Sequence, residues 1–350
     1  MILDELQHPI IQAPMAGGPS TVALALAVSN AGGMGFLATG YGRVEVMRAQ
    51  IAELRSGTEV AFGVNVFLPQ AADFDEDAVT RYLDRLAPEE KRYGAKLGPP
   101  RNDDDDWQGF LDALEAERPP VVSFTFGCPS AEELARLRTV GISTWVTITD
   151  PSEGVIAQER GADALIVQGF EAGGHRGGFS DDGEGEELSV LALLRLTRAA
   201  CELPLVAAGG IADGESLAAV LVAGASAAQI GSAFMLADEA ATHPAHRARL
   251  SAPAPTALTR AFSGRRARGI ANRFQSEHSA HAPRAYPQIH YATSPLRARA
   301  REQGDADGFN LWAGQTHALA RPLPAAEIVR TLSADAAAAV WRTAARLDAN

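Results

Sequence analysis

The sequence predicts a (β/α)8 TIM barrel, an α/β fold in which eight parallel strands alternate with helices. Three observations lead to this prediction. Short apolar runs alternate with stretches of helical periodicity, eight such units precede residue 256, and most runs are continuously apolar, as strands covered on both faces should be. Strands joined by right-handed crossovers close most simply into a barrel, with a doubly wound open sheet as the alternative.

The predicted strands are spaced so that a helix fits between most neighbours. We place them at residues 10–15, 34–39, 61–68, 121–126, 143–149, 164–168, 205–208 and 228–230. The intervening helices have recognisable ends: Ser130 and Glu133 form a capping-box pattern at one start and Gly141 closes that helix, with the same pattern in residues 213–224. In a barrel, functional groups gather in the loops after the carboxyl ends of the strands.

Two segments exceed a minimal barrel. Residues 69–106 form a polar insertion after the third strand, either a lid over the site or a solvated excursion, and we interpret its DDDD run as solvated. Residues from 256 onward are predicted to form a helical appendage. The expected division is therefore a cofactor-binding barrel, residues 1–255, with a C-terminal helical segment, residues 256–350, packed on it.

Composition excludes several classes of protein. The 350 residues are 46% hydrophobic, enough for one large core, and 31 Lys and Arg against 43 Asp and Glu give a net charge of −12. Nucleic acid and anionic membrane surfaces are therefore not expected partners. Cys128 and Cys201 are too few for a disulfide framework, and we find neither a signal-peptide pattern nor a membrane-length apolar run. We expect a cytoplasmic protein.

The predicted strand ends are mostly uncharged, which limits the chemistry. Lysine occurs only at Lys91 and Lys96, both in the insertion, so no strand end offers the lysine of a Schiff-base mechanism. Asp150 and Glu171 alone make a poor metal site, and we predict no metal. Cys128 follows a strand without an obvious activating base and is interpreted as structural. A glycine-rich and amide-rich rim suits a planar cofactor that brings its own reactivity.

Two loops carry the strongest functional pattern. Gly209 and Gly210 follow the seventh strand and Gly231 the eighth, where open backbone N–H groups bind phosphate in many barrels, although tight turns are the simpler use of such glycines. His175 follows the sixth strand in QGFEAGGHRGGF, between two glycine pairs that let backbone approach a ligand. Histidine titrates near neutrality, so we interpret His175 as catalytic.

These motifs together resemble the nitronate monooxygenase family, formerly called 2-nitropropane dioxygenases, over most of the chain. The resemblance rests on PIIQAPMAGG, AGGMGFL, FGVNVFLP, the histidine loop, AAGGIADG, AAQIGSAF, TRAFSGRRARGIANRF and LWAGQ, in this order. It implies FMN as cofactor and the oxidation of alkyl nitronates with O2 to a carbonyl compound and nitrite. The implied partners are small molecules, and we expect a monomer or homodimer.

The resemblance also implies roles for individual residues. His175 falls on the family's active-site histidine, which acts on the substrate as a base or as a partner for its negative charge. Thr147 stands by the flavin where some relatives carry lysine. The remaining implied cofactor contacts are Ala13, Pro14 and Met15 beside the ring, Asn65, Gln168, Gly173 and Gly174 around it, and Gly209, Gly210, Gln229, Ile230, Gly231 and Ser232 at the phosphate. Capping of strand ends is the alternative role for Asn65 and Gln168.

Other functions remain open at this point. Sister enzymes on the same scaffold use NAD(P)H and FMN to reduce quinones or enoyl thioesters, and a flavin-free phosphate-binding isomerase or ligand-binding barrel belongs to a different class. In FSGRRARGIANRF, four arginines could bind an acidic group, but we favour packing or solvation: Arg265, Arg266, Arg268 and Arg273.

Overall fold

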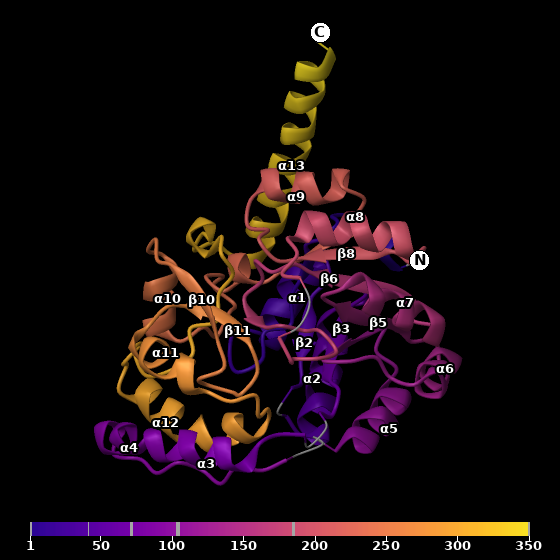
Figure 1. Cartoon of the computed structure of the whole chain (residues 1–350). Coiled ribbons are helices and arrows are strands. Elements are labelled where there is room, and N and C mark those ends of the chain that lie inside the picture. The colour runs from indigo at the N-terminus through magenta and orange to yellow at the C-terminus, as the bar shows by residue number, and fades with distance from the viewer. Residues whose placement is uncertain (1, 41, 71–72, 103–105, 184–185, 349–350) are drawn as a thin grey trace.

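The computed structural model describes residues 2–40, 42–70, 73–102, 106–183 and 186–348. Three of the four aspartates of the DDDD run, and with them its predicted solvation, lie outside the described residues. Figure 1 shows a barrel, a second lobe formed by α3, α4 and α10 to α12, and one long helix that projects from the body.

A parallel eight-stranded sheet forms the barrel and confirms the predicted fold. Its strand order is β1-β9-β8-β6-β5-β4-β3-β2, and a parallel bridge between Ile11 and Met34 joins its two edges. The strands are β1 (Ile10–Gln12), β2 (Phe36–Ala38), β3 (Gly63–Phe67), β4 (Val121–Thr125), β5 (Ser143–Ile148), β6 (Ala164–Gln168), β8 (Leu205–Ala208) and β9 (Ala227–Ile230). Several predicted strands are shorter than expected. The first ends at Gln12 because Met15 instead donates its N–H to the Ser20 hydroxyl at 2.8 Å.

Alternate strand residues face two separate layers of the core. Ile11, Phe36 and Trp145 belong to the cluster inside the barrel, whereas Ile10 belongs to the layer between strands and helices. This period of two follows from the pleat of a strand. Because both faces are covered by apolar side chains, the strands read as continuous apolar runs in the sequence.

Helices surround the strands on the outside. They are α1 (Val22–Asn30), α2 (Val44–Gly57), α5 (Trp107–Glu117), α6 (Ala131–Thr139), α7 (Pro151–Arg160), α8 (Val190–Ala200) and α9 (Gly214–Val222). The predicted capping box is confirmed, since the Ser130 side chain accepts from Glu133 N and the Glu133 carboxylate accepts from Ser130 N. The C-terminal helix α13 (Ala325–Asp348) packs on α9 and α1 and so completes the outer ring. The barrel's last helix therefore comes from the segment that the sequence assigned to the appendage.

The segment after residue 255 begins with strands where a helix was expected. Strand β10 (Thr256–Thr259) pairs antiparallel with β11 (Ala267–Ile270), and β11 pairs with β7 (Gly174–His175), a short strand not predicted from the sequence. Helices α10 (Pro244–Leu250), α11 (Arg273–His278) and α12 (Gln288–Glu302) surround this small sheet. It forms because the loop after β6 presents an edge that β11 can extend.

The described part of the insertion packs on the C-terminal segment, and none of its described residues lines the cavity at the carboxyl ends of the strands. Its helices α3 (Glu76–Arg85) and α4 (Ala87–Tyr93) are anchored by two buried tyrosines. Tyr82 donates to Ala261 O at 2.7 Å, and Tyr93 donates to the Asp305 carboxylate at 2.8 Å. In the part of the chain that the structure describes, no helix is long and apolar enough to span a membrane.

Candidate active site

A cavity of about 540 Å³ lies at the carboxyl ends of the barrel strands. This volume is within the range typical of cofactor and substrate pockets. Its far wall comes from residues 309–316 and from α10 and α12, so the second lobe closes the barrel's open end. Among the described residues that line the cavity there is no aspartate or glutamate, whereas Arg301 is present. The cavity wall is therefore neutral to positive.

The structure brings nearly all the predicted site residues to this cavity. Ile230 is the exception, because its side chain is buried in the outer core and its carbonyl accepts from Ala13 N at 2.8 Å. The predicted site residues that line the cavity are Ala13, Pro14, Met15, Asn65, Thr147, Gln168, Gly173, Gly174, His175, Gly209, Gly210, Gln229, Gly231 and Ser232.

His175 sits on β7, with its ring held by the second lobe. Its Nε2 lies 2.8 Å from the Ser263 Oγ, and the Ser263 hydroxyl also lies 3.2 Å from the Arg265 carbonyl oxygen. A carbonyl oxygen only accepts, so when both hydrogen bonds form the Ser263 hydroxyl donates its single proton to the Arg265 carbonyl. His175 then donates from Nε2, which leaves its Nδ1 lone pair as the ring's acceptor.

Desolvation keeps the ring of His175, which is half-buried at the cavity wall, neutral. Desolvation, together with the positive charges of Arg265 and Arg297, lowers the pKa of His175 to about 3. The rings of Phe126, Tyr286 and Trp312 lie 5.8, 5.6 and 5.5 Å from the imidazole centroid. At neutral pH the site thus presents an uncharged imidazole in an aromatic wall.

The two predicted amides at strand ends are largely used within the protein. Gln168 donates from Nε2 to His175 O at 3.0 Å and accepts at Oε1 from Gly177 N at 2.8 Å, so it holds the histidine loop. Asn65 donates from Nδ2 to Ser123 Oγ at 2.9 Å and to Thr125 Oγ1 at 3.0 Å. In the described chain its Oδ1 has no protein donor and stays open to a ligand N–H. Both amides therefore order the rim, and Asn65 keeps one free acceptor.

Two glycine loops line the cavity after β8 and β9. Gly209 and Gly210 have φ of 106° and 71°, a left-handed conformation that favours glycine. The N-terminus of α9 is already capped by the Asp213 side chain, which accepts from Ser216 N at 2.8 Å. A phosphate would consequently be bound by the loops themselves, Gly209–Gly210 and Gly231–Ser232, and not by this helix end.

Three buried polar side-chain atoms on the cavity wall lack hydrogen-bond partners within the described residues. They are the Nε2 of Gln229, the Oγ1 of Thr242 and the Nε2 of His246. Such groups are costly unless a ligand or water satisfies them. Gln229 was predicted from the sequence, but Thr242 and His246 were not, because they lie beyond the last barrel strand.

Several aromatic residues of the cavity wall were not predicted from the sequence. Trp312 lies in the LWAGQ motif, which supported the family resemblance but from which no site residue was predicted. Phe126 follows β4 with φ of 76°, an unusual conformation for a bulky side chain, and Arg265 stacks over its ring at 4.2 Å. Phe126 therefore links the strained end of β4 to the residues that hold His175.

The arginine-rich segment is used for packing, in line with the favoured interpretation. Arg265 is buried and donates to the carbonyl of Arg176 at 3.0 Å and to Gln70 Oε1 at 2.8 Å. Arg266 pairs with Asp181 at 3.3 Å, and Arg268 donates to Phe170 O at 3.0 Å. These contacts fasten the β10–β11 sheet to the histidine loop.

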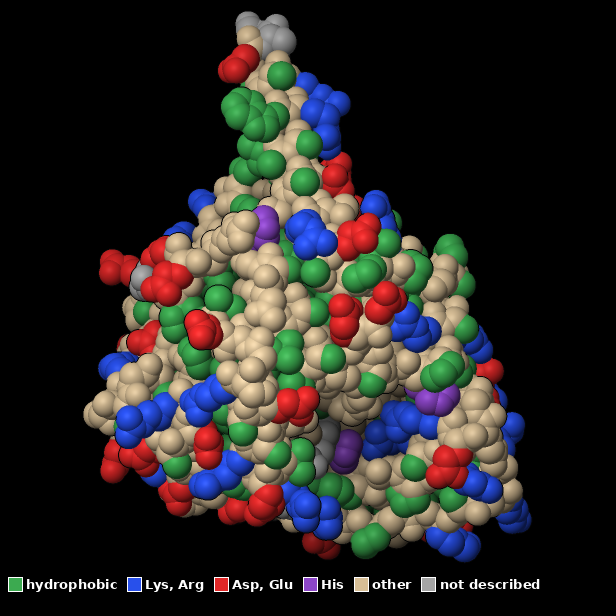
Figure 2. Space-filling view, turned by 180° about the vertical axis from the view of Figure 1, so that it is seen from behind, with side chains coloured by type: hydrophobic (Ala, Val, Ile, Leu, Met, Phe, Trp, Pro, Cys, Tyr) green, Lys and Arg blue, Asp and Glu red, His purple; other side chains and the backbone are tan. Residues whose placement is uncertain are grey.

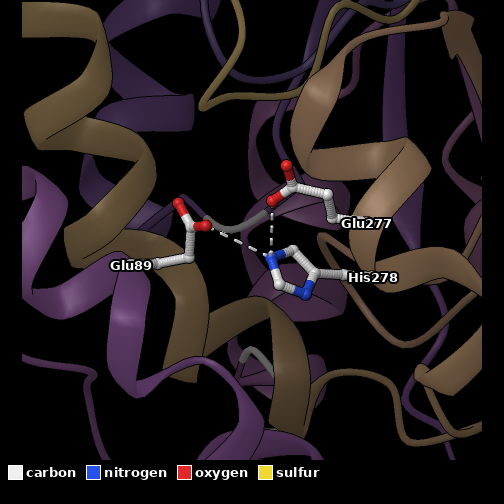
Figure 3. A group of neighbouring side chains, drawn as sticks. All are labelled: Glu89, Glu277 and His278. Atoms are coloured by element: carbon white, nitrogen blue, oxygen red, sulfur yellow. Dashed lines mark hydrogen bonds and ion pairs between the residues drawn. The ribbon is translucent and has the colours of Figure 1, made fainter.

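Glu89, Glu277 and His278 form a separate cluster (Figure 3). The side-chain atoms that could bind a metal ion lie within 4.8 Å of one another. Arg273 already supplies a positive charge there, donating to both Glu89 oxygens at 2.7 Å and to Glu277 at 2.6 Å. Burial alone would raise the pKa of Glu89, but hydrogen bonds from His278 and Arg273 lower it to about 2. The cluster is an ion-pair network that joins α4 to α11.

The fold and the cavity define a (β/α)8-barrel enzyme with a pocket large enough for a cofactor. The family model described as nitronate monooxygenase matches residues 2–335. A nitronate monooxygenase of Pseudomonas aeruginosa is 44% identical over 340 residues, 93% of this chain and 95% of that protein. One from Paraburkholderia phytofirmans is 42% identical over 338 residues, 93% of this chain and 92% of that protein.

A solved structure gives the same result. The nitroalkane oxidase from Streptomyces ansochromogenes superposes with a TM-score of 0.94 at 48% identity, covering 98% of this chain and 99% of that one. The chain belongs to the nitronate monooxygenase family. It is an enzyme that oxidises nitronates, and the family to which it belongs is flavin-dependent. The alternatives of a quinone or enoyl-thioester reductase and of a flavin-free barrel are not favoured.

Proposed function

We propose that the flavin is FMN and that it binds in the cavity at the carboxyl ends of the strands. The loops Gly209–Gly210 and Gly231–Ser232 would hold its phosphate with backbone N–H groups. The unpartnered Gln229 Nε2 and the open Asn65 Oδ1 offer a donor and an acceptor to its polar atoms. When bound, FMN would supply the redox chemistry that couples oxidation of the substrate to reduction of O2.

We further propose that His175 acts on the substrate as a neutral base. Its Nδ1 would take the α-proton of a nitroalkane, and the hydrogen bond from Nε2 to Ser263 would keep the ring in the required tautomer. Ser263 acts through His175 and is a positioning residue. The Arg265 carbonyl orients Ser263 in turn.

The charge of the wall supports an anionic substrate. Arg301 lines the cavity, donates to Asn310 Oδ1 at 2.9 Å and pairs with no acidic residue in the described chain. A guanidinium without a carboxylate partner favours negative charge nearby. Trp312 and Phe126 exclude water around His175, which strengthens these electrostatic interactions.

The observation that carries the proposal is the chain of contacts from His175 through Ser263 to the Arg265 carbonyl at the wall of a carboxylate-free cavity. The test is to release and identify the flavin of the purified protein, then mix the holoenzyme anaerobically with ethylnitronate or with NADPH. We expect the flavin released from the purified protein to be FMN, and we expect ethylnitronate to bleach the flavin of the holoenzyme. Bleaching by NADPH alone would make the enzyme a reductase, and colourless protein that cannot be reconstituted with FMN would contradict flavin binding.

We infer a small-molecule nitronate and O2 as the physiological partners. A cytoplasmic location stays a prediction, supported by the finding that Cys128 and Cys201 are buried free thiols.

A further inference from the structure

Helix α13 leaves the body of the protein before it ends. Its buried residues finish at Ala339, and beyond it every described residue is exposed except the partly buried Ala344. Figure 1 shows this part of α13 projecting alone, and Figure 2 shows hydrophobic side chains gathered along one side of the projection. Trp341 is 76% exposed. An exposed tryptophan offers a partner a large apolar surface together with an N–H donor.

One face of α13 is free along most of its length. We call it the free face, and its exposed members recur every three or four positions within about one third of the helix circumference. They are Arg330, Ala334, Ala337, Ala338, Trp341, Ala345 and Asp348. The buried residues Ile328, Leu332 and Ala339 occupy a different side, which packs on the barrel. The free face thus consists of small residues, one tryptophan and a charge at each end.

We propose that the free face pairs two copies of this chain, with the two α13 helices antiparallel. A two-fold axis beside Ala339 places Trp341 against the partner's Ala337, and each of these contacts occurs twice. The same axis places Arg330 beside the partner's Asp348. Alanines let two helices approach to about 8 Å, which gives each tryptophan a surface to cover.

The symmetry of the sequence selects a second copy over an unrelated partner. Trp341 and Ala337 lie two positions after and two positions before Ala339, and Asp348 and Arg330 lie nine positions after and nine before it. The two residues of opposite charge therefore lie at equal distances from Ala339 along the helix, and so do the large and the small residue. A parallel pair would instead bring like charges together. From Arg330 to Asp348 the face is about 27 Å long.

Sedimentation velocity of the holoenzyme over a range of concentrations tests this inference. The wild type should pass from monomer to dimer as concentration rises, while Trp341→Ala and Arg330→Asp should each weaken dimerisation at least about tenfold. The double variant Arg330→Asp/Asp348→Arg should restore it. Arg346→Asp makes the same charge change on another side of the helix and should still dimerise. All variants should keep nitronate oxidation, which confirms that they fold.

A wild type that stays monomeric at every concentration would overturn the inference. So would a dimer that Trp341→Ala and Arg330→Asp leave unchanged. Failure of the double charge reversal to restore dimerisation would overturn the antiparallel register.

Discussion

The Nε2 atom of His175 lies 2.8 Å from the Oγ atom of Ser263, across the interface between the barrel and the second lobe. The two residues are 88 positions apart in the sequence. They meet because β11 pairs with β7, with Ala267 opposite His175. The C-terminal segment is thus needed to orient the proposed base, and this relationship leads to the first predictions.

Replacing Ser263 should impair the orientation of His175 without removing the base. Ser263→Ala leaves the imidazole Nε2–H without its acceptor, and the other tautomer becomes accessible. We expect kcat for nitroalkanes to fall about tenfold to a hundredfold, with KM little changed. Ser263→Thr keeps the hydroxyl and should retain most of the activity. Steady-state kinetics checks both, and equal rates for Ser263→Ala and the wild type would contradict the positioning role.

The desolvated, neutral His175 should make the protein less stable in acid. In the unfolded chain a histidine titrates near 6.5, whereas the pKa of His175 in the folded protein is about 3. Between these values the unfolded chain binds the additional proton, so the free energy of unfolding falls as pH drops from 6.5 toward 3. Above pH 6.5 there is no such effect. Urea denaturation at pH 7 and pH 4.5 should show a larger loss for the wild type than for His175→Gln, and equal losses would refute the depressed pKa.

The Glu89–Arg273 ion pair should be a major link between the insertion and the C-terminal segment. Arg273→Met leaves the carboxylate of Glu89, whose side chain is only 3% exposed, without its bidentate partner. We expect a loss of about 3–5 kcal/mol in the free energy of unfolding. The double variant Glu89→Gln/Arg273→Met should be less destabilised than Arg273→Met, because no uncompensated charge remains. Chemical denaturation measures both, and a double variant that is no more stable would argue against charge burial as the cause.

Gly210 should be needed for the cofactor because of its backbone. Its φ is 71°, and an added Cβ would lie 3.2 Å from Glu171 Cβ, so Gly210→Ala strains and displaces the loop. We expect FMN affinity to fall about tenfold, equivalent to about 1.4 kcal/mol. Gly304→Ala is a matched control, since Gly304 has φ of 69° and open space around it. Fluorescence titration with FMN separates the two, and equal affinities would count against the proposed phosphate loop.

The barrel could be predicted because each of its strands and helices has a recognisable pattern within its own stretch of sequence. Each strand is an apolar run, and the helix before Gly141 has its own capping box. The small sheet could not be predicted in this way, since its three strands, β7, β10 and β11, form only by pairing with one another, and β7 lies far from the other two in the sequence. The same holds for α13, which completes the ring after a long excursion through the second lobe. Periodicity within a segment gives no information on such distant partners.

The site was predictable to the extent that its residues follow barrel strands. Gly210 and His175 were identified through their positions in loops after predicted strands, and Gln229 through the AAQIGSAF motif of the last strand. Ser263, Trp312 and His246 come from the second lobe, whose placement over the barrel depends on tertiary packing. The amide of Gln168 was expected to face a flavin, but most of its hydrogen bonds hold the histidine loop. Identifying a residue at a strand end therefore did not establish which partner it binds.

The proposed base is tested most directly by comparing nitroethane with its preformed anion, ethylnitronate, in the FMN-loaded wild type and His175→Ala under anaerobic conditions. Nitroethane must lose its α-proton, whereas ethylnitronate has already lost it. The account predicts that His175→Ala slows flavin bleaching by nitroethane about 10²- to 10⁴-fold and bleaching by ethylnitronate much less. Unimpaired bleaching by nitroethane, in a variant that still binds FMN, would contradict His175 as the base.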